Sequence, residues 1–152
     1  MRFRFVWPGK TKDERLRSLL EEYLKRLSRF TQCAVTEIRE SAGGDGRSKA
    51  KEARRIVEAL ASAGAVIVLD EQGRELSSTE LADQIARWEQ ESVKEVAFVI
   101  GGPEGVGTEV KSRANAQWRI SRMTFTHEMT RVLITEQLYR AYTINRGMPY
   151  QK

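Results

Sequence analysis

The sequence predicts a single α/β domain, residues 1–152, built on a parallel sheet with helices on both faces. Short apolar runs suited to buried strands alternate with longer segments whose apolar residues recur at intervals of three and four. This alternation continues to the carboxyl end, and no repeat or linker interrupts it. A chain of 152 residues is long enough for such a domain to bury roughly 70% of its unfolded surface.

The first strand and helix are predicted near the amino terminus. Residues 2–7 alternate polar and apolar side chains, as a half-buried strand does, and Pro8 and Gly9 end this pattern. Thr11 and Glu14 have the spacing of a capping box, which would satisfy the free amides of a first helical turn. A single apolar stripe along the following helix is formed by Leu16, Leu19, Leu20, Tyr23, Leu24 and Leu27.

A second strand and helix are predicted after this pair. Residues 34–39 alternate again, and the glycine-rich residues 41–48 indicate a flexible loop. We expect Ser48 to cap the next helix, and Gly64 to end it, because glycine accepts the left-handed conformation common at helix ends. The apolar positions of this helix are Ala53, Ile56, Val57 and Leu60.

Three strands and three more helices are expected in the rest of the chain. The apolar runs 65–69 and 96–100 predict strands buried on both faces. Between them, Ser77 and Glu80 form a second capping-box pattern before a helix with an apolar stripe. The remaining elements are a short helix at 108–115, a strand at 118–121 and a long helix at 127–144.

Three loops are candidates for a binding site, because ligands of parallel sheets bind beyond the carboxyl ends of the strands. These loops are residues 70–73, 101–107 and 121–126. The glycines of the second loop allow close approach to the backbone. Their order does not match a dinucleotide-binding fingerprint, and the sequence around Gly9 lacks the first glycine of a phosphate-binding loop.

The residues of these loops also allow plainer interpretations. The glycines can form an ordinary tight turn, in which Glu104 caps the following helix. Trp118, Ile120 and Phe125 are suited either to the wall of an adenine-sized pocket or to the core.

His127 and Arg131 are four residues apart at the start of the last helix, so they share a face. The helix dipole and the guanidinium both disfavour a charged imidazole, so we expect a neutral His127 that can accept a proton. The alternative is that Thr126 caps the helix and His127 is a surface residue of its first turn.

Composition restricts the class of protein. Cys33 is the only cysteine, which excludes an intramolecular disulfide, indicates a cytoplasmic setting and suits a core or half-buried position. With a single histidine, the usual zinc site cannot form. The longest apolar run, 65–69, is far shorter than the ~20 residues of a membrane span, and residues 1–7 lack the apolar centre of a secretory signal.

The positive charge is concentrated at the carboxyl end. Residues 1–110 contain 18 basic and 19 acidic side chains, whereas residues 111–152 contain 8 basic and 2 acidic ones. This basic end predicts a polyanionic partner, first of all a nucleic acid. The alternative is a solvated surface that is rich in arginine.

Several motifs, in this order, resemble one family. They are Leu69-Asp70, Ile-Gly-Gly-Pro-Glu-Gly at 100–105, Leu-Tyr-Arg-Ala at 138–141 and Pro149-Tyr150, with His127 and Arg131 between them. The chain resembles the small bacterial methyltransferases that modify N3 of a pseudouridine in large-subunit ribosomal RNA, the RlmH family of the SPOUT superfamily. The resemblance covers essentially the whole chain.

The resemblance implies an α/β-knot fold with a trefoil knot in the C-terminal half, a feature that general folding rules exclude by default. It also implies S-adenosyl-L-methionine as cofactor and a homodimer whose C-terminal tails reach the partner's site. The cofactor-binding residues that it implies are Leu69, Gly102 and the backbone of Ser121, Arg122, Met123, Thr124, Phe125 and Thr126.

On this basis His127 is the expected base or positioning group, with Glu104 as an alternative base. Arg131 is expected to stabilise the anionic nucleobase or bind a phosphate, and Tyr150 to stack on a base. The residues expected to contact RNA phosphates, in the large subunit or the assembled ribosome, are Arg122, Arg140, Arg146 and Lys152.

Two features depart from the family pattern. The tail lacks both histidines of the usual Asn-His-Pro-Tyr-His ending, and Thr126 replaces a common proline. Two other functions therefore remain open at this stage: methylation of another RNA such as transfer RNA, and ribosome binding without catalysis.

Overall fold

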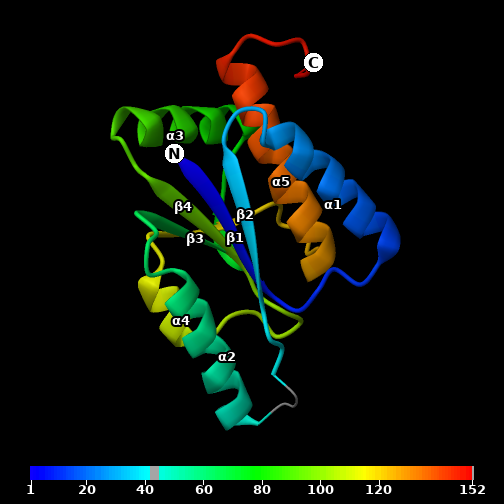
Figure 1. The fold of residues 1–152 in the computed structure, drawn as a ribbon, viewed down its shortest axis with the longest axis vertical. Coiled ribbons are helices and arrows are strands. Elements are labelled where there is room, and N and C mark those ends of the chain that lie inside the picture. Colours follow the sequence, from blue (N-terminus) through cyan, green and yellow to red (C-terminus); the bar gives the residue numbers. More distant parts are fainter. Residues whose placement is uncertain (42–44, 152) are drawn as a thin grey trace.

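Strands and helices alternate along the part of the chain that the structure, a computed structural model, describes: residues 1–41 and 45–151 (Figure 1). In chain order they are β1 Arg2–Pro8, α1 Glu14–Leu27, β2 Gln32–Ile38, α2 Gly46–Ala59, β3 Ala65–Glu75, α3 Ser78–Gln90, β4 Glu95–Ile100, α4 Thr108–Arg113, β5 Ala116–Arg119 and α5 His127–Asn145. The predicted alternation is confirmed.

The strands form one sheet in the order β2-β1-β4-β3-β5, and every neighbouring pair is parallel. Phe98 on the central strand β4 aligns with Phe5 of β1 and with Ile67 of β3. The predicted parallel sheet is therefore confirmed. The trefoil knot stays a prediction.

Helices cover both faces of this sheet. The core on one face joins α1, α3 and α5, and its centre is aromatic, with Phe3, Phe5 and Phe98 fully buried. The core on the other face joins α2 and α4, and its strand residues are smaller, for example Ala97 and Val99. Figure 1 shows α1 beside α5, and α2 beside α4. Because β3 and β4 each contribute apolar residues to both cores, the runs 65–69 and 96–100 are apolar throughout.

Two predicted helix caps are wrong. Asp13 caps α1, since its carboxylate accepts hydrogen bonds from the amides of Arg15 and Leu16, whereas Thr11 lies in the preceding loop. Asp45 caps α2 by accepting from the amide of Ser48, so Ser48 lies inside the helix. In both places an aspartate competes with a hydroxyl residue, and either side chain is a good cap. Part of the predicted loop 41–48, residues 42–44, lies outside the described residues.

The segment predicted as the loop 70–73 belongs to β3, whose register against β5 shifts between Leu69 and Arg74. A Cβ on Gly73 would lie 2.5 Å from the carbonyl carbon of Trp118, so only glycine lets the two strands approach this closely. β5 accordingly starts at Ala116, before the predicted 118–121.

Gly64 does not end α2, which is capped by Leu60; instead the amide of Gly64 donates to the carbonyl oxygen of Glu95, next to β4. Two other caps are confirmed. Ser77 and Glu80 form the capping box of α3, and Thr126 caps α5 by accepting from the amide of Met129. Among the described helices, none has the length and apolar character needed to cross a bilayer.

Candidate functional site

An open cleft of about 950 Å³ lies where β4 and β5 end, beside the bulge of β3 and the start of α5. All three loops predicted from the sequence line it, through residues 69–72, 100–106 and 119–121 with 123–127. Such a volume lies in the range of small-molecule sites. The lining also includes Lys111, Gln117 and Thr130, which the sequence did not single out.

A tight glycine turn forms one wall of the cleft. The amide of Gly105 donates to the carbonyl oxygen of Gly102 at 2.9 Å, and Gly105 has a φ of +75°. A Cβ on Gly101 would lie 2.5 Å from the carbonyl carbon of Gly105, so the turn itself requires glycine there. A Cβ on Gly102, in contrast, would meet only Pro8 Cγ at 4.0 Å. Gly102 is thus a position where the absence of a side chain leaves room in the cleft.

Glu104 lies on the same turn and binds Lys49, with 2.7 Å between the carboxylate oxygen and Nζ. The N-cap of α4 is Gly107, and no side chain caps this helix. The predicted capping role of Glu104 is therefore wrong. Its carboxylate is largely exposed and forms an ion pair with a lysine of α2.

An ion pair that the sequence did not predict also lines the cleft. Lys111 Nζ is 3.1 Å from Asp70 Oδ2, and the side chain of Asp70 is only 10% exposed. Asp70 Oδ1 also accepts a hydrogen bond from the amide of Gln72. Asp70 and Lys111 are far apart in sequence, so the only local signal was an aspartate at the end of a buried run.

The third loop supplies a mixed wall. Ser121 and residues 123–126 line the cleft, whereas Arg122 is 84% exposed and directs Nε to Glu75 at 3.7 Å. Ile120 and Phe125 line the cleft, which favours the pocket-wall interpretation for both. Trp118 is core, stacked on Trp88 at a ring-centroid distance of 5.9 Å.

His127 lines the cleft from the first turn of α5. Partial burial lowers the pKa of His127 below its usual 6.5, and the positive charge of Arg131 lowers it further. These effects exceed the opposing influence of Glu128 and Glu40. The imidazole is therefore neutral at about pH 7 and can accept a proton.

Arg131 is fully buried, under the loop between β1 and α1. Its Nη2 donates to the carbonyl oxygen of Pro8 at 2.8 Å, and its Nη1 donates to Thr11 Oγ1 at 3.0 Å. The guanidinium carbon is 4.8 Å from the centre of the Trp7 ring. Arg131 is not among the residues that line the cleft, and burial lowers its pKa.

The predicted tail residues lie at the other end of α5 (Figure 1). Tyr150 donates its hydroxyl to Glu136 at 2.9 Å, and its ring lies under the guanidinium of Arg140 at 4.8 Å. Burial raises the pKa of Tyr150 and keeps the phenol protonated. Arg146 lies over the ring of Phe30, and Lys152 lies outside the described residues. Within one chain, Tyr150, Arg140 and Arg146 are not among the residues that line the cleft.

The cleft therefore combines main-chain groups, apolar side chains, the ion pair of Asp70 with Lys111 and one neutral imidazole. Within the described part of the chain, no cluster of histidine, cysteine, aspartate and glutamate side chains is suited to a metal ion. Cys33 is half-buried on β2, away from the cleft lining, and burial raises its pKa to about 11, so the thiol is unreactive. Proton acceptance next to a bound small molecule is the chemistry that these residues support.

Comparison with known proteins identifies relatives along the whole chain. A family model described as "Predicted SPOUT methyltransferase" matches residues 1–151. A protein of Geotalea uraniireducens named ribosomal RNA large subunit methyltransferase H is 40% identical over 99% of both chains. The protein of that name from Geobacter sulfurreducens is 39% identical over 99% of both chains. The one from Desulfotalea psychrophila is 38% identical over 100% of both.

The solved structures with a similar fold include a protein of Haemophilus influenzae. It is titled "a probable methylase family protein" and superimposes with a TM-score of 0.60 at 14% identity. The match covers 99% of this chain and 70% of that one.

Proposed function

The chain belongs to the SPOUT methyltransferases, in the group of ribosomal RNA large subunit methyltransferase H, and we propose that it methylates N3 of a pseudouridine in large-subunit ribosomal RNA. The methyl donor in this proposal is S-adenosylmethionine, and the protein acts in the cytoplasm, where ribosomes are assembled. The observation that carries the proposal is the meeting, in one cleft, of a glycine turn that is open at Gly102 with the neutral imidazole of His127.

The cleft suits this donor in chemistry and size. Leu69, Ile100 and Ile120 supply apolar walls for an adenine ring. The backbone of Gly102 and of residues 121–126 supplies hydrogen-bonding groups. At Gly102 no side chain blocks access to them. When bound, S-adenosylmethionine supplies an electrophilic methyl group on its sulfonium.

His127 then has a defined task. N3 of pseudouridine carries a proton that must leave before or during methyl transfer, and a neutral imidazole that lines the cleft can accept it. The cleft walls hold the reacting atoms together, an effect that can lower a barrier by about 7–11 kcal/mol. Arg131 contributes indirectly, since its guanidinium is buried and bonded to backbone.

The site is completed by a second copy of the chain. Along α5, from His127 to Asn145, the axial distance is about 27 Å, so a chain's own Tyr150 lies far from its own cleft. In the proposed homodimer the partner's tail supplies Tyr150, Arg140 and Arg146 to the RNA side of the site. The homodimer, the shared tail and a trefoil knot around the donor are all expectations for the family.

Incubation of the purified protein with labelled S-adenosylmethionine and either ribosomes or transfer RNA tests the proposal. We expect label in large-subunit ribosomal RNA, at N3 of a pseudouridine by mass spectrometry. Label in transfer RNA would instead show a different acceptor. Salt-sensitive ribosome binding without label would show a binding protein that has lost catalysis along with the tail histidines.

A further inference from the structure

We propose that the β1–α1 loop, residues 9–13, is an RNA-binding wall of the methyl-transfer site. Lys10 and Lys12 bind phosphates of the target strand, and Arg131 and Glu128 are positioning residues that hold this loop against α5. The inference rests on the proposed function and adds residues that the expectations for the RNA-binding surface did not include.

Arg131 holds the start of the loop. It is fully buried and donates to the carbonyl oxygen of Pro8 and to the hydroxyl of Thr11. Thr11, itself 6% exposed, therefore points into the protein between two exposed lysines. Charged donors form stronger hydrogen bonds than neutral ones, so these bonds give the loop a rigid base.

Glu128 holds the end of the loop. Its Oε1 accepts a hydrogen bond from the amide of Asp13 at 3.0 Å. The first residue of the loop, Gly9, has a φ of +72°, and a Cβ there would lie 2.7 Å from the carboxyl carbon of Glu40. The loop is thus attached to α5 at two points and packed closely against the end of β2.

The same attachments place the loop beside the cleft. Glu128 follows His127 directly in the first turn of α5. On the other side, Pro8 Cγ is the atom nearest to a Cβ built on Gly102, at 4.0 Å. The loop residues themselves are not part of the cleft lining, but the loop starts next to the glycine turn and ends against the residue that follows His127, so it lies beside the cleft.

The charges on the loop are available to an anion. Lys10 and Lys12 are exposed, and within the described residues Lys10 forms no ion pair. Lys12 Nζ is 3.6 Å from Glu40 Oε2, with the two side chains 72% and 44% exposed, so this pair is weak. The carboxylate of Asp13 is occupied by the cap of α1 and by Arg15.

An RNA strand fits this surface better than a small anion does. Two ammonium groups on a rigid loop, separated by a buried threonine, can contact successive phosphates while the target base turns from the strand toward His127. Such contacts fix the register of the strand and carry no sequence information. They are the element that a base-modifying enzyme needs at the mouth of its pocket.

Binding to purified bacterial ribosomes, measured without methyl donor over a range of salt concentrations, tests the lysines. We expect Lys10→Gln and Lys12→Gln each to weaken binding about fivefold near 0.1 M salt and to lower the slope of log K against log salt by about 0.7 to 0.9. Lys94→Gln, which removes the same charge from an exposed residue just before β4, is the matched control and should leave the slope unchanged. Unchanged slopes in both loop variants would overturn the inference.

The positioning residues are tested with Glu128, because an Arg131 variant can lose its fold. We expect Glu128→Ala to raise KM for ribosomes about tenfold with kcat within about twofold, and Glu128→Gln, whose amide oxygen still accepts from Asp13, to restore KM. Equal KM values for the Ala variant and the unmodified protein would refute the positioning role. Ribosome binding without methyl transfer would instead contradict the proposed function. In that case the salt series would still test the role of the lysines.

Discussion

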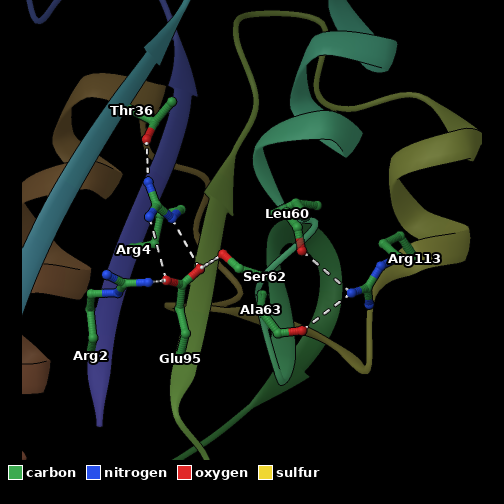
Figure 2. A network of polar contacts seen from close by, with 8 residues as sticks. All are labelled: Arg2, Arg4, Thr36, Leu60, Ser62, Ala63, Glu95 and Arg113. Atoms are coloured by element: carbon green, nitrogen blue, oxygen red, sulfur yellow. Dashed lines mark hydrogen bonds and ion pairs between the residues drawn. The ribbon is translucent and has the colours of Figure 1, made fainter.

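Arg4 donates from Nε to Glu95 Oε1 at 3.0 Å (Figure 2). This bond joins the neighbouring strands β1 and β4 near the amino-terminal ends of the sheet strands. Arg2 forms a second ion pair with the same carboxylate, and Ser62 donates its hydroxyl to it at 2.9 Å. Glu95 is 1% exposed. A buried carboxylate thus connects two strands and the segment after α2, at the end of the strands opposite to the cleft.

Glu95→Gln should lower the free energy of unfolding by about 3 kcal/mol, because two guanidinium groups lose their anion in a buried site. Chemical denaturation measures this change. The exposed Glu58→Gln on α2 is the control and should stay within about 0.5 kcal/mol. A Glu95→Gln variant as stable as the unmodified protein would show that the network contributes nothing net.

The same carboxylate makes stability depend on pH. Burial alone would raise the pKa of Glu95, but hydrogen bonds from Arg4, Ser62 and Arg2 outweigh it, so the pKa is lower than the usual 4.5. A lowered pKa in the folded state means that this contribution is present above about pH 4.5 and is lost as the pH falls through the lower, folded value. We expect a shallower acid dependence of the melting temperature in Glu95→Gln.

His127→Ala should reduce the single-turnover rate of methyl transfer by about 10² to 10⁴, the usual contribution of a general base. Donor affinity, measured by calorimetry, should change by less than about threefold, since main chain supplies most of the binding groups. A rate equal to that of the unmodified protein would exclude His127 from proton transfer.

The rate should also fall at low pH. The imidazole acts as a base only when neutral, and its pKa lies below 6.5 because of burial and Arg131. The single-turnover rate should therefore be constant above about pH 6.5 and decrease as the pH falls through the lowered pKa. The absence of this decrease in His127→Ala is the internal control.

The neighbouring glycines 101 and 102 should respond differently to alanine. Gly101→Ala should destabilise the fold by about 1–3 kcal/mol, because its Cβ would lie 2.5 Å from the backbone of Gly105. Gly102→Ala should leave the melting temperature nearly unchanged but weaken donor binding by at least about tenfold, since its methyl group enters the cleft. Equal donor affinity in Gly102→Ala and the unmodified protein would show that the donor does not bind next to this turn.

Mixing two inactive variants should restore activity if the tail acts on the partner. His127→Ala supplies an intact tail, and a chain lacking residues 148–152 supplies an intact cleft. When equal amounts mix at random, the number of complete sites is about a quarter of that in the unmodified protein. Activity should recover to about a quarter of the unmodified level. Each variant alone is the control. A mixture no more active than its parts would mean that each tail serves its own chain.

Local sequence patterns were sufficient for most of the fold. The strand β4 is predicted from its continuous apolar run and the helix α1 from its apolar stripe, because both patterns report burial directly. The bulge in β3 was missed, because Gly73 is required by a contact with Trp118 that no local pattern encodes. The caps of α1 and α2 were wrong because two polar side chains within a few residues had similar capping ability.

The amino-acid sequence by itself determined that glycines follow a buried strand and that a histidine begins the last helix. Tertiary structure decided what those residues do. It brought the end of β4 next to α5, buried Arg131 beneath the loop that contains Thr11, and left Tyr150 at the opposite end of its helix. The physical reason is that periodicity encodes which face of an element is buried, whereas the identity of a distant neighbour depends on how the sheet is ordered.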